Sequence, residues 1–296
     1  MSQNLTVIRL FDPWKSPLCT CPRKYSLHPY TGCSHQCVYC YATSYIGLKN
    51  SIPKDGFIRR LQRDISIIPR GSIVELSTSS DPFPPIEEKQ LLTRRAIEIL
   101  ARHGFRILIT TKSHIVVRDV DILVNSQSAV MITITTLRED VARLIEPGAP
   151  SPKMRVEAIR KLVDQGVPVG VRVDPVIPYV NDDPNELTEI VEVVASAGAK
   201  HIVTSTYKAK WDSLKRFREL LGETGLKINN LYREKGVWIH GYLYLPVDYR
   251  KQLLKPVVDT ARKYGLTHAT CREGLIEYNR AQSCDGSHLT ILKQLK

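Results

Sequence analysis

The chain has 296 residues, of which 43% are apolar and 24% charged, and its formal net charge at pH 7 is +12. This composition is that of a globular protein long enough to bury a core, and it excludes a disordered chain. No apolar run approaches the roughly 20 residues that span a bilayer, and residues 1–15 lack the regions of a secretion signal. We therefore expect a cytoplasmic protein without a membrane segment.

Strand-like and helix-like segments alternate from about residue 72 onward, and the segment before Gly32 is a first strand-like unit. Short runs rich in apolar and β-branched residues predict strands at 71–78, 105–113, 129–137, 167–177, 199–207 and 237–247. Helical patterns cover 86–104, 113–126, 151–166, a segment starting at 184, 211–236 and 248–265. The pairs Ser151-Pro152 and Asp183-Pro184 are typical helix starts.

Repeated βα units with short connections imply parallel strands joined by right-handed crossovers. Five or six units predict a barrel or an open part-barrel of the α/β class. We expect 1–23 to be an N-terminal extension, 24–245 the core barrel and 246–296 a C-terminal helical extension. Five predicted strands end in polar residues, and the carboxyl ends of parallel strands build the site in such folds. These ends are Ser77–Asp81, Thr110–Ser113, Thr133–Thr136, Arg172–Asp174 and Thr204–Tyr207.

Three cysteines stand close together at Cys33, Cys37 and Cys40. Three thiolates on one short loop can hold three irons of a [4Fe–4S] cluster and leave the fourth iron open for a substrate. Zinc more often takes paired cysteines with a second pair elsewhere, and a disulfide leaves the third cysteine unexplained. The loop therefore predicts a cluster with one open iron.

With Tyr39 just before the third cysteine, this loop resembles the signature of the radical SAM superfamily. The resemblance implies a partial (βα)6 TIM-type barrel with N- and C-terminal extensions. It also implies that the open iron binds S-adenosylmethionine (SAM) and that reductive cleavage gives a 5′-deoxyadenosyl radical, which abstracts a hydrogen atom from the substrate. Tyr39 would pack beside the adenine, or simply wall off the cluster. The electron would come from a donor such as ferredoxin or flavodoxin.

Residues 24 to about 210 carry the motifs YSLHPYTGC, CVYCYA, STSSDP, ITTKSH and ITITT in that order. The order resembles spore photoproduct lyase and its relatives, a branch that includes a DNA-repair enzyme. By this resemblance Ser79 and Asp81 would face the nucleoside of SAM, and Lys112 would reach its carboxylate as a point charge. Thr133 and Arg172 would hydrogen-bond nearby. Each of these residues could equally be a capping or barrel-mouth residue.

The sequence departs from the lyase at Thr78. The lyase has a cysteine at this position, where it returns a hydrogen atom to the substrate. A threonine hydroxyl is a poor hydrogen-atom donor, so we expect an enzyme of this branch that is not a true spore photoproduct lyase. The lyase or transferase class stays open.

Four further cysteines lie near the two ends of the chain, at Cys19, Cys21, Cys271 and Cys284. Four thiols suit a zinc site or a second iron–sulfur cluster, although buried free thiols or disulfides also account for them. Residues 284–288 resemble the motif of CDGSH iron–sulfur proteins, which makes His288 a reserve ligand.

The charge is uneven along the chain. Residues 1–50 carry +4 and residues 201–296 carry +8, whereas residues 51–200 are neutral overall. Basic ends suit a nucleic-acid partner, but solubility explains them equally well. If the two ends meet, one basic surface should border the barrel mouth. The stretch 208–221, with Trp211 and Phe217, could bind phosphates and stack bases, or be an amphipathic helix with a solvated basic face.

We therefore expect a radical SAM enzyme that acts on nucleic acid, in tRNA modification or DNA lesion repair. One alternative is the modification of a protein or small metabolite. A second alternative is a non-catalytic iron–sulfur protein, which the incomplete three-cysteine ligation disfavours, because an electron carrier normally has all of its irons ligated by the protein.

Overall fold

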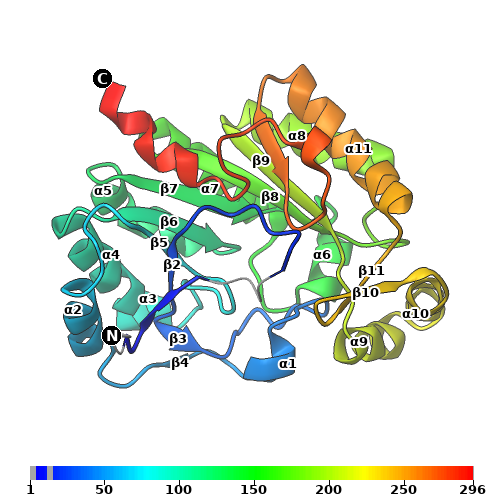
Figure 1. Cartoon of the computed structure of the whole chain (residues 1–296), viewed down its shortest axis with the longest axis horizontal. Helices are drawn as coiled ribbons and strands as arrows, with labels where there is room; N and C mark the ends of the chain where they lie inside the picture. The colour runs from blue at the N-terminus through cyan, green and yellow to red at the C-terminus, as the bar shows by residue number, and fades with distance from the viewer. Residues whose placement is uncertain (1–4, 12–15, 296) are drawn as a thin grey trace.

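An eight-stranded sheet forms the centre of the computed structural model, which describes residues 5–11 and 16–295 (Figure 1). Its strands, in spatial order, are β1 (Ile8–Leu10), β2 (Tyr25–Leu27), β5 (Ile73–Leu76), β6 (Arg106–Thr111), β7 (Ser128–Thr133), β8 (Val169–Val176), β9 (His201–Thr206) and β12 (Thr267–Thr270). Neighbouring strands from β2 to β12 are parallel, and β1 is antiparallel to β2. The two edge strands do not pair with each other, so the sheet is an open part-barrel.

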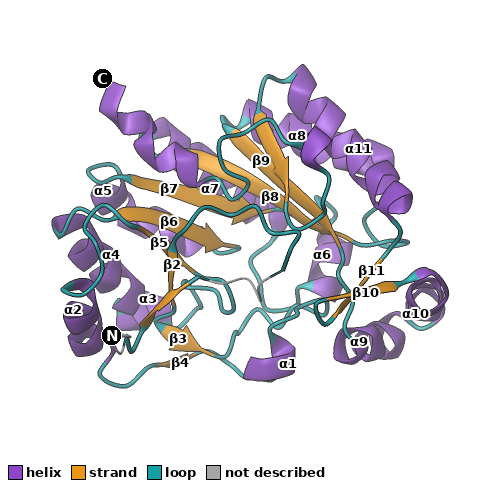
Figure 2. Ribbon diagram, viewed as in Figure 1, coloured by secondary structure: helices purple, strands orange, loops and turns teal. Residues whose placement is uncertain are grey.

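Helices lie mostly around the outside of this curved sheet (Figure 2). They are α1 (Thr43–Ile46), α2 (Phe57–Ile65), α3 (Glu87–Gln90), α4 (Leu92–Arg102), α5 (Val120–Leu123), α6 (Glu139–Ile145), α7 (Pro152–Asp164), α8 (Pro184–Ser196), α9 (Trp211–Leu221), α10 (Glu223–Lys235) and α11 (Val247–Lys263). Of these, α1, α9 and α10 do not cover the sheet but lie away from it at the bottom of the view in Figure 2. Short 3₁₀ segments are η1 (His114–Asp119), η2 (Ile276–Tyr278) and η3 (Ser287–Leu295). Buried apolar residues of the strands and helices form one large core, which includes Val74, Ile107, Val130, Val171, Ile202, Ala96, Ile159 and Val257.

The other face of the sheet is covered by the C-terminal segment. Leu289 of η3 packs in a small apolar cluster with Leu108 and Met131 of the strands. Arg106 fixes this segment, since its Nε donates to the Thr290 hydroxyl (2.8 Å) and its Nη2 to the Ser287 carbonyl (2.9 Å). The start of η3 therefore packs against the inner face of the part-barrel.

The predicted α/β part-barrel is confirmed: six strands from β2 to β9 are joined by helical connections. Two predicted helix starts are also present. The Ser151 hydroxyl accepts from the Met154 N–H, and the Asp183 carboxylate accepts from the N–H groups of Asn185 and Glu186, as N-caps do.

Three segments differ from their predicted form. The helix predicted at 86–104 is broken at Leu91, whose φ is +51°, because the Glu87 carboxylate caps a new helix by accepting from the Leu92 N–H (3.0 Å). The segment 113–126 consists of the 3₁₀ turn η1 followed by the short helix α5 instead of one continuous α-helix. The strand predicted at 237–247 is a hairpin of β10 (Val237–Ile239) and β11 (Tyr242–Tyr244), because His240 and Gly241 turn the chain with positive φ.

Both terminal segments contribute an edge strand to the sheet, β1 near the start and β12 near the end. Part of the predicted N-terminal extension, residues 1–4 and 12–15, lies outside the described residues. The division at 23/24 and 245/246 stays a prediction. Across the described ranges, no helix has both the length and the apolar character needed to cross a bilayer.

Candidate functional site

An open cavity of about 250 Å³ lies at the carboxyl ends of the parallel strands. Of the residues singled out from the sequence as cofactor or metal ligands, all except the reserve ligand His288 line it. The set comprises Cys33, Cys37, Cys40, Tyr39, Ser79, Asp81, Lys112, Thr133, Arg172, Cys19, Cys21, Cys271 and Cys284. Residues far apart in the chain therefore share one space, as expected for the strand ends of a parallel α/β fold.

The three-cysteine loop begins at Gly32, directly after β3 (Tyr30–Thr31), which pairs with β4 (Ile52–Pro53). Gly32 has φ +72°, and a Cβ there would lie only 2.4 Å from the Asn50 carbonyl oxygen. Glycine alone fits this close approach. The Cys33 N–H donates to the Lys49 carbonyl (2.8 Å), which fixes the start of the loop against the chain just before β4.

The far side of the loop is held by α6 and α9. The Val38 N–H donates to the Ile145 carbonyl (2.9 Å). Arg216 of α9 donates from Nε to the Val38 carbonyl (2.9 Å) and from Nη2 to the Cys40 carbonyl (3.1 Å). One cation of the basic helix therefore serves to hold the loop.

Burial raises the pKa of Cys37 above that of a free thiol. Iron binding would displace the proton, because the thiolate is the ligand form. Within the described part of the chain, no three Cys, His, Asp or Glu side chains form a group that could hold one metal ion. A cubane cluster makes a different demand, since each of its thiolates binds a separate iron.

A charged network lies beside the loop. Tyr39 donates its hydroxyl proton to the Glu146 carboxylate, which also pairs with Arg155 (Nη1 to Oε2, 2.6 Å) and lies 3.8 Å from the Lys112 Nζ. Lys112 lies over the Tyr39 ring, 5.5 Å from its centre. Burial acts to lower the pKa of Lys112, but Cys37 and Glu146 raise it above its usual range. Lys112 is therefore a permanent cation in the cavity.

Asp81 connects the ends of β5 and β6. Its carboxylate accepts from the Thr111 hydroxyl (2.7 Å), the Lys112 N–H (2.8 Å) and the Phe83 N–H (2.9 Å). Both oxygens are thus occupied by the protein, and the carboxylate sets the position of Lys112. Its predicted contact with the nucleoside of SAM stays a prediction.

Ser79 and Thr78 are both hydrogen-bonded to His28. The ring Nε2 accepts from the Thr78 N–H (3.0 Å) and lies 3.0 Å from the Ser79 hydroxyl oxygen. Burial lowers the pKa of His28 to about 3, helped by the nearby Lys54 charge. A neutral ring suits the acceptor role at Nε2.

At the end of β7, the carbonyl of Thr133 accepts from Arg155 (3.2 Å). Arg172 donates to the Asp174 carboxylate, which also accepts from the Ser205 hydroxyl (2.5 Å). Arg172 is therefore paired within the protein before any ligand binds.

Several charged groups of the cavity were not foreseen from the sequence. Lys24 bridges Glu75 (2.6 Å) and Asp285 (2.5 Å). Lys208 pairs with Glu273 (2.8 Å). The one local signal was Glu75, a carboxylate inside the otherwise apolar run of β5, because a buried charge requires a partner.

The model of the "Radical SAM superfamily" matches residues 27–194, more than half of the chain. The chain belongs to the radical SAM superfamily. It is therefore an enzyme of the family that uses a [4Fe–4S] cluster and SAM. The donor set in the cavity fits both groups, because three thiols of one loop and a buried cation face the same space.

Several curated proteins are similar to this radical SAM enzyme. An uncharacterized protein of Acidianus two-tailed virus is 28% identical over 242 residues, covering 70% of this chain and 79% of that protein. The "Radical SAM Nalpha-GlyT isomerase" of Pseudomonas phage M6 is 24% identical, covering 83% of this chain and 53% of the relative.

Several solved structures share the fold. Spore photoproduct lyase complexed with dinucleoside spore photoproduct has a TM-score of 0.66 at 19% identity, covering 89% of this chain and 78% of the lyase chain. Streptococcus suis SuiB bound to the precursor peptide SuiA has a TM-score of 0.54 at 12% identity, covering 83% of this chain and 48% of that one. The expected likeness to the lyase fold is confirmed.

Proposed function

We propose that this radical SAM enzyme acts on a nucleic acid, in tRNA modification or DNA lesion repair. Cys33, Cys37 and Cys40 would hold the [4Fe–4S] cluster. When bound, the cluster supplies the electron that cleaves SAM to the 5′-deoxyadenosyl radical, which abstracts a hydrogen atom from the substrate. The residues proposed to contact SAM are Tyr39, Ser79, Asp81, Lys112, Thr133 and Arg172.

The chain's own residues prepare this site. Lys112, held by Asp81 and paired with Glu146 at 3.8 Å, offers a fixed positive charge for the SAM carboxylate. Tyr39 is 9% exposed and its hydroxyl is bound to Glu146, so its ring is a rigid wall. Rigid walls around the reacting atoms exclude water, with which the radical would otherwise react.

The observation that carries the nucleic-acid proposal is a group of cationic and aromatic side chains at the cavity. Arg272 lies over the rings of Tyr41 and Tyr242, at 5.8 and 5.2 Å from their centres. All three line the cavity together with Lys208. Arginine and aromatic rings stack on bases and bind phosphates, which is the combination that nucleic-acid sites use.

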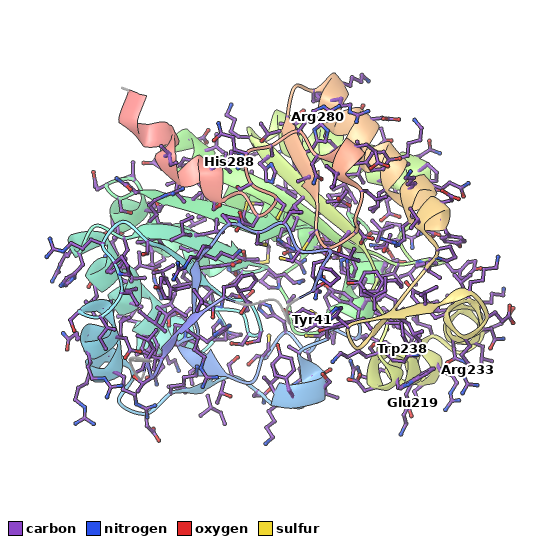
Figure 3. All side chains as sticks on the ribbon, in the orientation of Figure 1. Tyr41, Glu219, Arg233, Trp238, Arg280 and His288 are labelled. Carbon is purple, nitrogen blue, oxygen red and sulfur yellow. The ribbon has the colours of Figure 1, made fainter. Side chains whose placement is uncertain are left out.

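Further aromatic and basic side chains continue from this rim toward α9. Lys210 lies 4.7 Å from the centre of the Tyr242 ring. Next to it, Trp211 (52% exposed) packs edge-on against Trp238 (49% exposed), with Arg233 over the Trp211 ring (Figure 3). Phe217, in contrast, is fully buried against Tyr207. Only the Trp211 part of the predicted stacking surface is therefore accessible.

The two basic ends of the chain come together at the cavity, since Lys24 contacts Asp285 and the Cys21 and Cys284 sulfur atoms lie 3.5 Å apart. Because the excess of Lys and Arg lies in these two parts of the sequence, their proximity supports a polyanionic substrate. The solved lyase bound to a dinucleoside photoproduct supports the same class.

Thr78 separates this enzyme from spore photoproduct lyase in the proposal. Its hydroxyl lies 2.9 Å from the His28 Nε2. An O–H bond gives up a hydrogen atom far less readily than the S–H of a cysteine, so Thr78 would not complete the lyase reaction.

A second candidate function is modification of a peptide, favoured by the likeness to SuiB bound to its precursor peptide. The cytoplasmic location and a ferredoxin or flavodoxin donor remain predictions.

One experiment tests the proposal. The anaerobically reconstituted enzyme is given dithionite and SAM, with tRNA, duplex DNA or a peptide mixture. We expect 5′-deoxyadenosine in all cases, a higher rate with one nucleic acid, and binding of that nucleic acid that weakens steeply with salt. Stimulation by peptide alone, or salt-independent binding, would contradict the nucleic-acid proposal. Arg272→Gln should weaken nucleic-acid binding, whereas Arg218→Gln, on the exposed side of α9, should not.

A further inference from the structure

Four thiols outside the three-cysteine loop are brought together by the fold. Cys19 and Cys21 come from the N-terminal segment, Cys271 follows β12, and Cys284 precedes η3. All four line the cavity and none is in a disulfide. The Sγ atoms of Cys21 and Cys284 lie 3.5 Å apart although 263 positions separate them in the chain.

The remaining two thiols lie next to this pair. Cys19 and Cys21 share a side-chain hydrogen bond. Cys271 follows β12 and lines the same cavity. We call these four cysteines the terminal thiol group.

The backbone around this group is fixed without any metal. Lys24 joins Asp285, next to Cys284, to Glu75 of the sheet through contacts of 2.5 and 2.6 Å. Gly286 lies so close to β7 that a Cβ would be 2.3 Å from the Met131 sulfur atom. The loop bearing Cys284 is therefore pressed onto the sheet in one position, and its thiol faces the N-terminal segment.

Both ring nitrogens of His288 lie near hydroxyl groups of the protein, so the ligands of this site would all be cysteines. Its Nδ1 lies 2.8 Å from the Ser283 hydroxyl, and its Nε2 lies 3.3 Å from the Thr267 hydroxyl. In Figure 3 His288 lies on the C-terminal segment, away from Tyr41. The ligand set suggested by the CDGSH motif, three cysteines and a histidine, does not form here.

We propose that Cys19, Cys21, Cys271 and Cys284 bind a second [4Fe–4S] cluster in the same cavity as the three-cysteine loop. Four thiolates are the complete ligand set of such a cluster, one for each iron. A zinc ion would instead need all four sulfur atoms about 2.3 Å from one point, and within the described residues no three Cys, His, Asp or Glu side chains are placed to hold one metal ion. Because the cluster carries net negative charge with four thiolates, the cation Arg272, which follows Cys271 and also lines the cavity, favours it.

This cluster would differ in kind from the first. With every iron bound by the protein it has no open position for SAM or substrate. It would tie the N-terminal segment to the C-terminal one and add a redox centre to the cavity. The inference is independent of which substrate the enzyme uses.

The test counts iron and sulfide in three anaerobically reconstituted full-length proteins. These are the wild type, a variant with serine at the four cysteines of the terminal thiol group, and a variant with alanine at Cys33, Cys37 and Cys40. We expect about eight irons per chain in the wild type and about four in each variant. Circular dichroism verifies that each variant is folded.

Electron paramagnetic resonance distinguishes the two sites even if one variant folds poorly. The alanine variant should keep a reducible cluster whose signal does not change on adding SAM. The serine variant should keep a cluster whose signal does change, because only that cluster has an open iron. An alanine variant without iron, a wild type with about four irons, one zinc per chain, or a Cys21–Cys284 disulfide in protein purified without oxygen would each overturn the proposal.

Discussion

Lys112 shows how a residue with several partners becomes a ligand site. Its backbone N–H is fixed by Asp81, and its ammonium group lies near Glu146 and over the Tyr39 ring. Burial acts to lower its pKa, but the surrounding Cys37 and Glu146 raise it. The cation is therefore held in one place, by Asp81 at its backbone and by the Glu146 carboxylate 3.8 Å from its Nζ.

Replacing Lys112 with glutamine should weaken SAM binding about tenfold or more, because a hydrogen bond to a charged group contributes about 1.5–3 kcal/mol. The measurement is the SAM dissociation constant of the reconstituted protein, at equal iron content. As a control, Lys161→Gln removes the same charge from the exposed face of α7, where the Lys161 side chain is 60% exposed. This variant should leave the SAM dissociation constant unchanged. Equal constants for the wild type and the Lys112 variant would exclude the proposed contact.

At the scale of elements, the three-cysteine loop depends on the β3–β4 hairpin. Gly32 and Gly71 have nearly the same backbone angle, φ +72° and +74°, but different surroundings. A Cβ at Gly32 would lie 2.4 Å from the Asn50 oxygen, whereas a Cβ at Gly71 would meet nothing within 4 Å. Substitutions at Gly32 and Gly71 therefore distinguish the free energy lost to the left-handed backbone angle from that lost to a steric clash.

Gly71→Ala should lower the free energy of unfolding by about 1–2 kcal/mol, the penalty for a left-handed residue, and leave iron content unchanged. Gly32→Ala should carry the same penalty and in addition displace the loop, so it should lose most of the iron bound by Cys33, Cys37 and Cys40. Chemical denaturation and iron analysis of both variants measure the two effects. Equal iron in the two variants would show that the loop tolerates the shift.

The sequence predicted correctly those elements whose formation depends on residues close together in the chain. Ser151 and Asp183 cap helices as their sequence pattern indicates. The strand β12 was missed, because Thr267, His268 and Thr270 give no apolar run. It is a strand because it pairs with β9, which is a tertiary effect.

The same distinction holds for the site as a whole. The spacing of Cys33, Cys37 and Cys40 predicted three thiols that share one site, because three residues on one short segment stay together in any fold. The bridge from Lys24 to Asp285 could not be predicted, since 261 positions separate the two residues and only the folded sheet brings them together. Long-range charge pairs of this kind have no local pattern.

The stability of the whole molecule should depend on His28, which the fold keeps neutral at the base of the Ser79 turn. Burial, with Lys54, lowers its folded pKa to about 3, whereas an unfolded histidine has a pKa of about 6.5. The contribution of neutral His28 to the free energy of unfolding is therefore fully present above pH 6.5. It is lost as the pH falls from 6.5 toward 3, because the histidine of the unfolded chain binds a proton first. Between pH 6.5 and 5.5 the wild type should lose about 1 kcal/mol of unfolding free energy more than His28→Gln. Urea denaturation at both pH values measures this difference.

A control variant is His103→Gln, at an exposed position after α4, which should keep the pH dependence of stability seen in the wild type. If His28→Gln instead loses stability as steeply as the wild type, protonation of His28 is not the cause of the loss of stability at low pH.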